Sequence, residues 1–329
     1  MFGCDRSHLT GWERYANILQ ECITGNSGVE VGVISSPASD KTIRRAAEAA
    51  WHFSHLHRLV ENMQADVYHS PSFPLIGQLN IPTIWSVHDD IIVGGHPRYA
   101  SRGTRYWKLP ARRCLAVVDA VVTFTNSSAR DLERAGADSA RIHVIGPPQP
   151  DVPPPGPPPL LVDAHGDPAT FPQEFLLAVG TIEPRKRPAL AAEIAASVKT
   201  PLVFVGRPRG IDTRDLPGHP LFAFGADNAQ LSWCYENARA LMAVSAYEGI
   251  DLPLFEALST GLPVLASPVD VHTELAAGHV TFLNEADPIR SSGEALLNMP
   301  SRGDRVRLLS SRGELGSAHA KLYKSILAA

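Results

Sequence analysis

Residues 240–266 predict a strand, a tight turn, a helix and a second strand in immediate succession. The apolar residues 240–244 suit a buried strand, and Gly249 allows the chain to turn sharply after it. Pro253 suits the first turn of a helix, where its missing N–H costs nothing. A helix that directly follows a buried strand and leads into another strand indicates an α/β fold.

Two glutamates lie near the start of this helix, Glu248 in the turn and Glu256 in the first helical turn. The free N–H groups at a helix start carry partial positive charge and bind phosphate or another anion. An anion site beside two carboxylates suits a phosphate that is joined to hydroxyl-rich rings. The alternative interpretation is that Glu248 and Glu256 are surface acids and that Asp251 caps the helix.

Apolar runs and helical patterns alternate in both halves of the chain. In the first half, strands are predicted over 29–34, 66–69, 83–88, 120–125 and 142–145, and helices over 12–22, 42–63, 104–117 and 127–135. In the second half, strands are predicted over 175–179, 202–205, 221–224, 240–244, 264–266 and 280–283, and helices over 187–198, 228–236, 253–260 and 288–297. Strands that are apolar throughout suit parallel sheets covered on both faces. Each half is therefore predicted to be a doubly wound, Rossmann-like α/β domain.

A proline-rich stretch, 147–172, separates the two halves. Its proline runs suit neither a helix nor a central strand, so we expect a semi-rigid linker there. A docking segment for a partner domain is the alternative. The predicted organisation is a first domain over 1–146, the linker over 147–172, a second domain over 173–312 and a final helix over 313–329 that packs back on the first domain.

Composition narrows the class of protein. The chain has 329 residues and a formal net charge of −4, which gives no whole-chain attraction to nucleic acid or anionic lipid. Its four cysteines lie far apart and fit a reducing cytoplasm better than a disulfide framework or a zinc site. No run approaches the roughly eighteen apolar residues of a membrane span, and the first residues show no signal-peptide pattern. We expect a cytoplasmic protein with at most peripheral membrane association. Basic and aromatic residues between Arg98 and Arg113 are interpreted as a solvated helix face, and contact with anionic lipid or an acidic acceptor is the alternative.

A second polar region, 180–188, follows the first strand of the second half. Arg185 can fork to two phosphate oxygens, and Lys186 adds a compact positive charge. A departing nucleoside diphosphate gains negative charge as its bond to a sugar breaks, and fixed cations stabilise that transition state. A solvated basic turn before a helix is the alternative.

Both regions resemble the corresponding segments of the retaining glycosyltransferases of family 4. The run from Tyr247 to Leu258 resembles the family's Glu-x7-Glu segment, and 180–186 resembles its Gly-Thr-Leu-Glu-Pro-Arg-Lys segment. The resemblance, nearest to a mannosyltransferase-like branch, implies the GT-B fold, in which two Rossmann-like domains face a cleft. It also implies a nucleotide-sugar donor such as a GDP- or UDP-sugar, with no cofactor and no metal.

The resemblance also implies roles for residues of the second half. Glu256 is expected to bind the two ribose hydroxyls of the nucleotide, and Glu248 to face the donor sugar. The backbone from Gly249 through Ile250 to Leu252 is expected to hold the sugar and the phosphate. Gly180 and Thr181 are expected to line the same donor site, with Lys186 as the phosphate-binding lysine.

Two departures from the family pattern bear on this site. Thr181 stands where many relatives have arginine, so we expect Arg185 to take over that charge. Ile250-Asp251 stands where relatives usually have Phe-Gly. The carboxylate of Asp251 either repels the diphosphate, selects a sugar hydroxyl or caps the helix, and capping is the favoured interpretation.

The first half carries the expected acceptor side. His88 and Asp89 end a predicted strand, where the family usually has His-Asp close to the donor sugar. The run around Gly11 and Trp12 resembles the family's glycine-containing loop near the diphosphate and the acceptor. Asp89-Asp90 is not the Asp-x-Asp of metal-dependent transferases.

The predicted activity is transfer of a sugar from a nucleotide-activated donor to an acceptor hydroxyl with retention of configuration. The acceptor is expected to be a glycan, a lipid-linked sugar or a small molecule, and no nucleic acid is expected. One alternative is a sugar-nucleotide epimerase or a phosphorylase on the same fold. Another is a catalytically inactive subunit that stabilises a partner.

Overall fold

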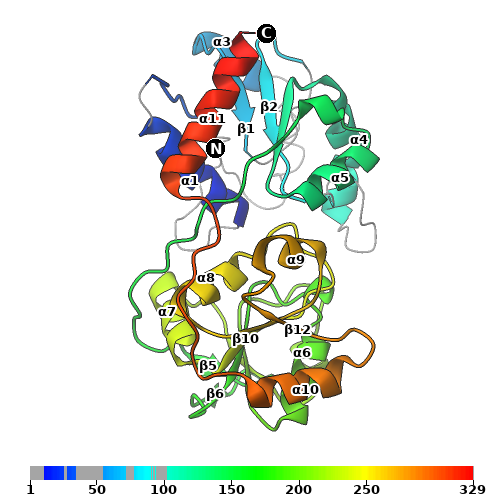
Figure 1. Cartoon of the computed structure of the whole chain (residues 1–329), viewed down its shortest axis with the longest axis vertical. Helices are drawn as coiled ribbons and strands as arrows, with labels where there is room; N and C mark the ends of the chain where they lie inside the picture. Colours follow the sequence, from blue (N-terminus) through cyan, green and yellow to red (C-terminus); the bar gives the residue numbers. More distant parts are fainter. Residues whose placement is uncertain are drawn as a thin grey trace. The chain divides into compact units, whose positions relative to one another are not determined.

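The structure is a computed structural model that describes residues 11–25, 28–34, 55–71, 78–89, 91, 93 and 102–328. The chain divides into two compact units (Figure 1). The first comprises Met1–Pro148 and Ser310–Ala329, and the second comprises Gln149–Leu309. Each unit is described by itself.

Among its described residues, the first unit contains a four-stranded parallel sheet of order β1-β2-β3-β4. Its strands are β1 (Tyr68–Ser70), β2 (Thr83–Ser86), β3 (Ala120–Thr123) and β4 (Ile142–Val144). Its helices are α1 (Gly11–Thr24), α3 (Leu56–Asn62), α4 (Arg102–Val117), α5 (Asn126–Arg134) and α11 (Arg312–Leu327), with a 3-10 turn η2 (Ser139–Arg141). The last helix, α11, packs against α1 at the other end of this unit's sequence (Figure 1).

Most of the predicted elements of the first half are present, with two differences. Residues 29–34 form no strand, so that prediction was wrong. The predicted helix over 42–63 lies partly outside the described residues, and its described part is α3. The strand residues Trp85 and Val121 are buried in a core with residues of α3, α4 and α5, and apolar strands of this kind suit a covered parallel sheet.

The second unit is built on an eight-stranded sheet of order β12-β11-β10-β7-β8-β9-β5-β6. The six parallel strands are β7 (Leu176–Val179), β8 (Leu202–Val205), β9 (Leu221–Ala223), β10 (Ala240–Ala243), β11 (Val264–Ala266) and β12 (Thr281–Phe282). Around them lie α6 (Pro188–Ser197), α7 (Asn228–Asn237), α8 (Leu252–Thr260), α9 (Asp270–Ala276) and α10 (Pro288–Asn298), with 3-10 turns η3 (Pro184–Lys186) and η4 (Thr213–Asp215). The two parallel sheets confirm the predicted α/β architecture with two Rossmann-like domains.

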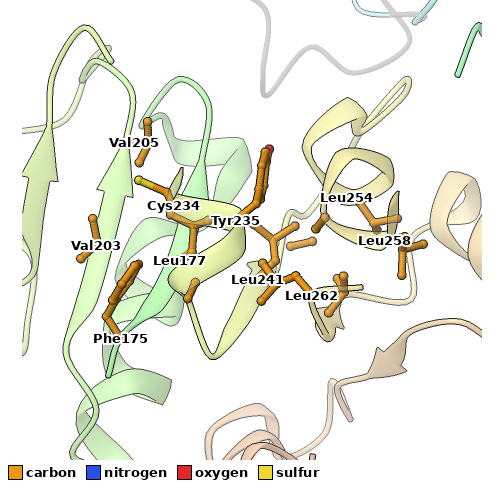
Figure 2. Packing of buried hydrophobic residues seen from close by; sticks show 14 of the residues in the cluster. Phe175, Leu177, Val203, Val205, Cys234, Tyr235, Leu241, Leu254, Leu258 and Leu262 are labelled. Carbon is orange, nitrogen blue, oxygen red and sulfur yellow. The ribbon is translucent and has the colours of Figure 1, made fainter. Parts of the chain in front are cut away.

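Alternate residues of the central strands enter two separate cores. Leu177, Val203 and Leu241 belong to the core that includes α7 and α8. Their sequence neighbours face the other core, with Leu176 and Met242 packing beside α6. Figure 2 shows the first of these cores around Tyr235. Both sheet faces are covered, because successive side chains of a strand point to opposite faces.

The proline-rich stretch contributes to the second unit. The sequence predicts a linker over 147–172, whereas in the structure Gln149 and the residues after it belong to the second unit. Short strands β5 (Leu161–Val162) and β6 (Pro168–Ala169) pair with each other, and β5 extends the sheet antiparallel to β9. Proline is tolerated there because β6 is the edge strand.

The strand order of the second unit reverses at β7. From β7 the chain adds β8 and β9 on one side, then crosses to place β10, β11 and β12 on the other. The turns that follow β7 and β10 therefore open side by side at the carboxyl edge of the sheet. In open α/β sheets this switch point is where ligands bind.

One glycine contact fixes the turn after β7. Gly206, at the end of β8, has a φ of +151°. A Cβ atom at this position would lie 2.0 Å from the carbonyl oxygen of Gly180. The backbone at the start of the β7 turn can approach β8 this closely only because residue 206 has no side chain.

We predict that Gly206→Ala destabilises the protein more than Gly210→Ala. Gly210 also has a positive φ, +73°, but nothing lies within 4 Å of its added Cβ atom. Both variants carry backbone strain, whereas only Gly206→Ala also forces Gly180 to move. We expect a loss of about 3 kcal/mol or more for Gly206→Ala, against about 1–2 kcal/mol for Gly210→Ala, in urea unfolding followed by circular dichroism. Equal losses would contradict this account of the turn.

Candidate active site

The turns after β7 and β10 are joined by backbone and side-chain contacts. The amide of Ala246 donates to the carbonyl oxygen of Arg185 at 2.7 Å. Arg185 in turn donates through Nη1 to the carbonyl oxygen of Tyr247 at 3.1 Å. These bonds hold the predicted basic turn against the predicted Glu-Gly turn.

Glu248 binds both predicted phosphate-binding cations. Its Oε2 accepts from Arg185 Nη1 at 2.5 Å, and its Oε1 lies 2.8 Å from Lys186 Nζ. Ser245 donates to the same Oε1 at 2.7 Å. The Glu248 side chain is only 4% exposed, so one buried carboxylate places two cations side by side.

A second buried glutamate, Glu183, flanks Arg185 on its other side. Arg185 Nε lies 2.6 Å from Glu183 Oε1, and Arg209 pairs with the second oxygen of the same carboxylate. The guanidinium of Arg185 therefore spans two carboxylates from two turns. Contacts with two carboxylates restrict the orientation of the guanidinium group.

Lys186 lines a crevice at the switch point. Gly180, Thr181, Ser245, Asp251 and Pro253 are among the residues that line the crevice with it. The added Cβ of Gly180 would lie 3.2 Å from Lys186 Cε, so the lysine side chain runs close along the turn. Burial alone would lower the pKa of Lys186, but Asp251 and Glu248 outweigh it and raise that pKa, which keeps the amine charged.

Asp251 does not cap α8 with its side chain, so the capping interpretation was wrong. It occupies the N-cap position, yet its carboxylate makes no capping hydrogen bond. Instead Oδ1 lies 3.4 Å from Lys186 Nζ, and Oδ2 lies 3.3 Å from His272 Nε2. Burial opposes ionisation of this carboxyl, but Lys186 and His272 outweigh burial and hold the pKa of Asp251 below its usual range.

The remaining residues of the predicted donor site lie around α8. Gly249 is buried, Ile250 packs against the core beside α8, and Leu252 is the first residue of that helix. Glu256 is buried on α8, and Tyr235 of α7 donates its hydroxyl hydrogen to Glu256 Oε2 at 2.7 Å.

Four residues of this site were not singled out in the sequence. Ser245 and Glu183 flank the predicted residues, and a polar residue directly after a buried strand is the signal that could have found Ser245. Tyr235 and His272 lie 21 residues from their partners in the sequence. No local pattern relates them to Glu256 or Asp251.

The predicted acceptor-side residues lie in the first unit. His88 follows β2 and is buried, donating from Nε2 to the carbonyl oxygen of Pro71 at 3.2 Å. Its ring stacks on Phe124 with centroids 4.1 Å apart. Asp89 accepts through Oδ1 from the amide of Ile91 at 3.0 Å, and Gly11 and Trp12 begin α1. Asp90 lies outside the described residues.

A buried polar network continues from this strand to the last helix. His69 lies between Ser86 and Tyr323, with its ring nitrogens 2.8 Å from each hydroxyl oxygen. His319 of α11 lies 3.4 Å, through Nε2, from the hydroxyl oxygen of Tyr15 in α1. Burial lowers the pKa of His69 well below its usual value, that of His88 to about 3 and that of His319 to about 4.

Comparison with protein families matches both halves of the chain. Residues 17–148 match the model described as Glycosyltransferase Family 4, and residues 169–292 match the model described as Glycosyl transferases group 1. A search of curated proteins found no match.

Solved structures resemble nearly the whole chain. Sucrose-phosphate synthase from Thermosynechococcus elongatus has a TM-score of 0.68 at 15% identity, covering 97% of this chain and 94% of its own. WaaG, a glycosyltransferase involved in lipopolysaccharide biosynthesis, has a TM-score of 0.61 at 16% identity, with 97% and 93% covered. HepE from Anabaena, in complex with UDP-glucose, has a TM-score of 0.57 at 13% identity, with 90% and 86% covered.

The two Rossmann-like parallel sheets, the solved structures that resemble them and the family matches define a GT-B glycosyltransferase, a transferase of the EC 2.4 class. The chain belongs to glycosyltransferase family 4, whose retaining enzymes transfer a sugar from a nucleotide-sugar donor. Within the part of the chain that the structure describes, no helix has the length and apolar character to cross a membrane.

We predict that the first unit loses stability as the pH falls below about 6.5. The folded pKa values of His69, His88 and His319 are depressed, so the unfolded chain binds more protons. Their contribution is fully present above the unfolded pKa and is lost as the pH falls toward the folded values. For His319, lowered to about 4, the loss at pH 5 is about 2 kcal/mol.

Urea unfolding at pH 7.5 and pH 5.0 measures this effect. His319→Asn should reduce the acid-induced loss of stability. His165→Asn, which changes an exposed histidine of the second unit, should leave that loss unchanged. An undiminished loss in His319→Asn would show that this histidine does not contribute to it.

Proposed function

We propose that the second unit binds the diphosphate of a nucleotide-sugar donor at Arg185 and Lys186. The observation that carries this proposal is that Glu248 holds both cations side by side at the switch point of the sheet. The first turn of α8 starts beside them and adds the partial positive charge of a helix N-terminus. Anions collect at such a combination of fixed cations and free amides.

The two cations act chiefly on the departing diphosphate. Breaking the bond to the sugar leaves additional negative charge on the phosphate oxygens. Arg185 and Lys186 are already fixed by buried carboxylates, so little reorganisation is needed when that charge appears. Arg185 fills the role that arginine at position 181 has in relatives, since Thr181 carries no charge.

The nucleotide is bound through its ribose by Glu256. The carboxylate is buried on α8, and Tyr235 fixes one of its oxygens. A carboxylate oriented in this way accepts hydrogen bonds from vicinal hydroxyls. Glu248, with the backbone from Gly249 to Leu252, contacts the donor sugar and the phosphate.

The first unit binds the acceptor, through His88, Asp89 and the start of α1 at Gly11 and Trp12. The acceptor hydroxyl attacks from the face that the diphosphate leaves, which retains the configuration at the sugar. The departing phosphate takes the acceptor's proton. Acceptors of this kind are a glycan, a lipid-linked sugar or a small molecule with a hydroxyl group.

Two donors are tested first. HepE was solved with UDP-glucose, and the resemblance to mannosyltransferase-like enzymes suggests GDP-mannose. Incubation of labelled UDP-glucose and GDP-mannose with and without acceptors distinguishes transfer from epimerisation and phosphorolysis. Transfer to a hydroxyl acceptor supports the proposal, and release of an epimer or a sugar phosphate without acceptor contradicts it.

Lys186→Ala should lower kcat more than it raises the KM for the donor, because the lysine stabilises charge that develops in the transition state. The expected loss is about 2.7–4 kcal/mol, and Arg185→Ala should behave similarly. Arg187→Ala is the matched control, because Arg187 in the same turn pairs with Glu285 instead. Steady-state kinetics at varied donor concentration give kcat and KM for all three variants. If both Lys186→Ala and Arg185→Ala match the control, the diphosphate does not bind here.

Glu256→Gln should weaken binding of the nucleoside diphosphate, because charge-assisted hydrogen bonds to the ribose are lost. Each such bond is worth about 1.5–3 kcal/mol. Tyr235→Phe should also weaken binding, but less, since it removes the hydroxyl that donates to one oxygen of the carboxylate. Calorimetric titration with UDP and GDP measures both, and unchanged affinities would contradict the ribose assignment.

Turnover should survive a chelator, because Arg185, Lys186 and the start of α8 supply the positive charge at the diphosphate. Transfer rates are compared in EDTA and after addition of magnesium or manganese. Loss of turnover in EDTA that either metal restores would contradict this prediction.

A further inference from the structure

Asp251 bridges Lys186 and His272 inside the second unit. Its two oxygens lie 3.4 Å from Lys186 Nζ and 3.3 Å from His272 Nε2. The side chain of Asp251 is 3% exposed and that of His272 is 0% exposed. Lys186 is the cation to which the proposed function assigns the diphosphate, so the imidazole is linked to the donor site through one carboxylate.

The hydrogen bond made by Nδ1 of His272 determines that the exchangeable proton is the one on Nε2. Nδ1 donates to the carbonyl oxygen of Ser267 at 2.9 Å, so it is protonated in both charge states. Nε2, which faces Asp251, is protonated only when the ring is charged. A proton at Nε2 therefore lies directly against the carboxylate that also contacts Lys186.

The groups around His272 favour the charged ring. Burial lowers the pKa of His272, but Asp251 outweighs burial, with a further contribution from Glu248, and the net shift is upward from 6.5. Lys186 faces the pair from the opposite side of Asp251. On its own helix, Asp270 and Glu274 are exposed to solvent.

We propose that Asp251 and His272 set the charge beside Lys186 and that donor binding is coupled to uptake of up to one proton at His272. This inference rests on the proposed function, because it requires the diphosphate to bind at Lys186. The family pattern places the backbone of Asp251 in the donor site, whereas it assigns no role to His272 or to the Asp251–His272 contact.

The charges in the site explain why protonation of His272 should strengthen donor binding. Arg185 and Lys186 face the carboxylates of Glu183, Glu248 and Asp251. With His272 neutral, Asp251 presents a full negative charge beside the incoming diphosphate. With His272 protonated, that charge is shared with the imidazolium and Lys186 is freer to bind phosphate oxygens.

Donor binding and protonation of His272 therefore favour each other. By linkage, the donor raises the proton affinity of His272 by the same factor by which protonation raises donor affinity. Since the pKa of His272 in the free protein is raised above 6.5, donor affinity should fall once the pH rises above that raised pKa. For one proton the steepest fall is about tenfold per pH unit.

Isothermal titration calorimetry of the full chain tests this linkage between pH 6.0 and 9.5. The probes are UDP-glucose and GDP-mannose, each in two buffers of different ionisation enthalpy, so that the heat reports proton uptake directly. A nucleotide sugar is used because the terminal phosphate of a free nucleoside diphosphate itself titrates at a pKa of about 6. We expect proton uptake of up to one per donor bound.

Two variants should give the donor affinities expected at the two extremes of pH. His272→Asn keeps a donor at the position of Nδ1 but cannot carry a charge, so its donor affinity should match that of the unaltered protein at high pH. Asp251→Asn removes the charge that opposes the diphosphate, while Glu248 still holds Lys186. Its affinity should stay at the low-pH level throughout. Neither variant should take up a proton on binding.

His279→Asn is the matched control, since His279 is an exposed histidine close to the same helix. It should keep both the proton uptake and the pH dependence. Asp251→Asn keeps the shape of the side chain, so it decides the question even if His272→Asn does not fold.

Donor binding without proton uptake, or with an undiminished pH dependence in Asp251→Asn, would overturn the inference and leave the proposed function intact. Failure of every nucleotide sugar to bind at any pH would overturn the proposed donor site itself. The two failures are therefore distinguished in the same titration.

Discussion

The buried carboxylate of Glu248 is the contact on which the arrangement of the site depends. Glu248 lies in the turn after β10 and binds Arg185 and Lys186, which lie in the turn after β7. Ser245 donates a hydrogen bond to the same carboxylate. Taking such charges out of water is expensive, and removing one member of a buried ion pair typically costs about 3–5 kcal/mol. The cluster is stable because each buried charge has a partner: Glu183 also contacts Arg185, and Asp251 also contacts Lys186.

This cluster exists because of where the sheet reverses its strand order. The turns after β7 and β10 are neighbours only because the chain crosses from one side of β7 to the other. Gly206 then allows the β7 turn to lie against β8, and the buried cores on both faces keep the strands in place. The charged groups are thus positioned in part by the packing of apolar residues that do not belong to the site.

Much of this could be predicted from the sequence. Apolar strands, a glycine turn and a proline-started helix identified the second unit, because each signal is local and the strands are buried on both faces. Arg185, Lys186, Glu248 and Glu256 were recognised because the motif places them within two short segments. Their roles toward a donor remain proposals.

What the sequence did not reveal depends on contacts between distant residues. The Asp251 side chain, expected to cap its helix, turns instead to Lys186 and His272, since a buried carboxylate is better stabilised by cations than by a helix start alone. Tyr235 was not found because nothing near it in the sequence relates it to Glu256. Strands β5 and β6 were missed because prolines surround them, and residues 29–34 show that an apolar run alone does not make a strand.

The central claim is that the diphosphate of the donor binds at Lys186 and Arg185. The most direct test is a crystal structure of the protein with an unreactive nucleotide-sugar analogue. The account predicts phosphate oxygens within hydrogen-bonding distance of Lys186 Nζ and the Arg185 guanidinium, with the ribose hydroxyls at Glu256. A bound analogue whose phosphates lie elsewhere, with Lys186 still paired only to Glu248 and Asp251, would contradict it.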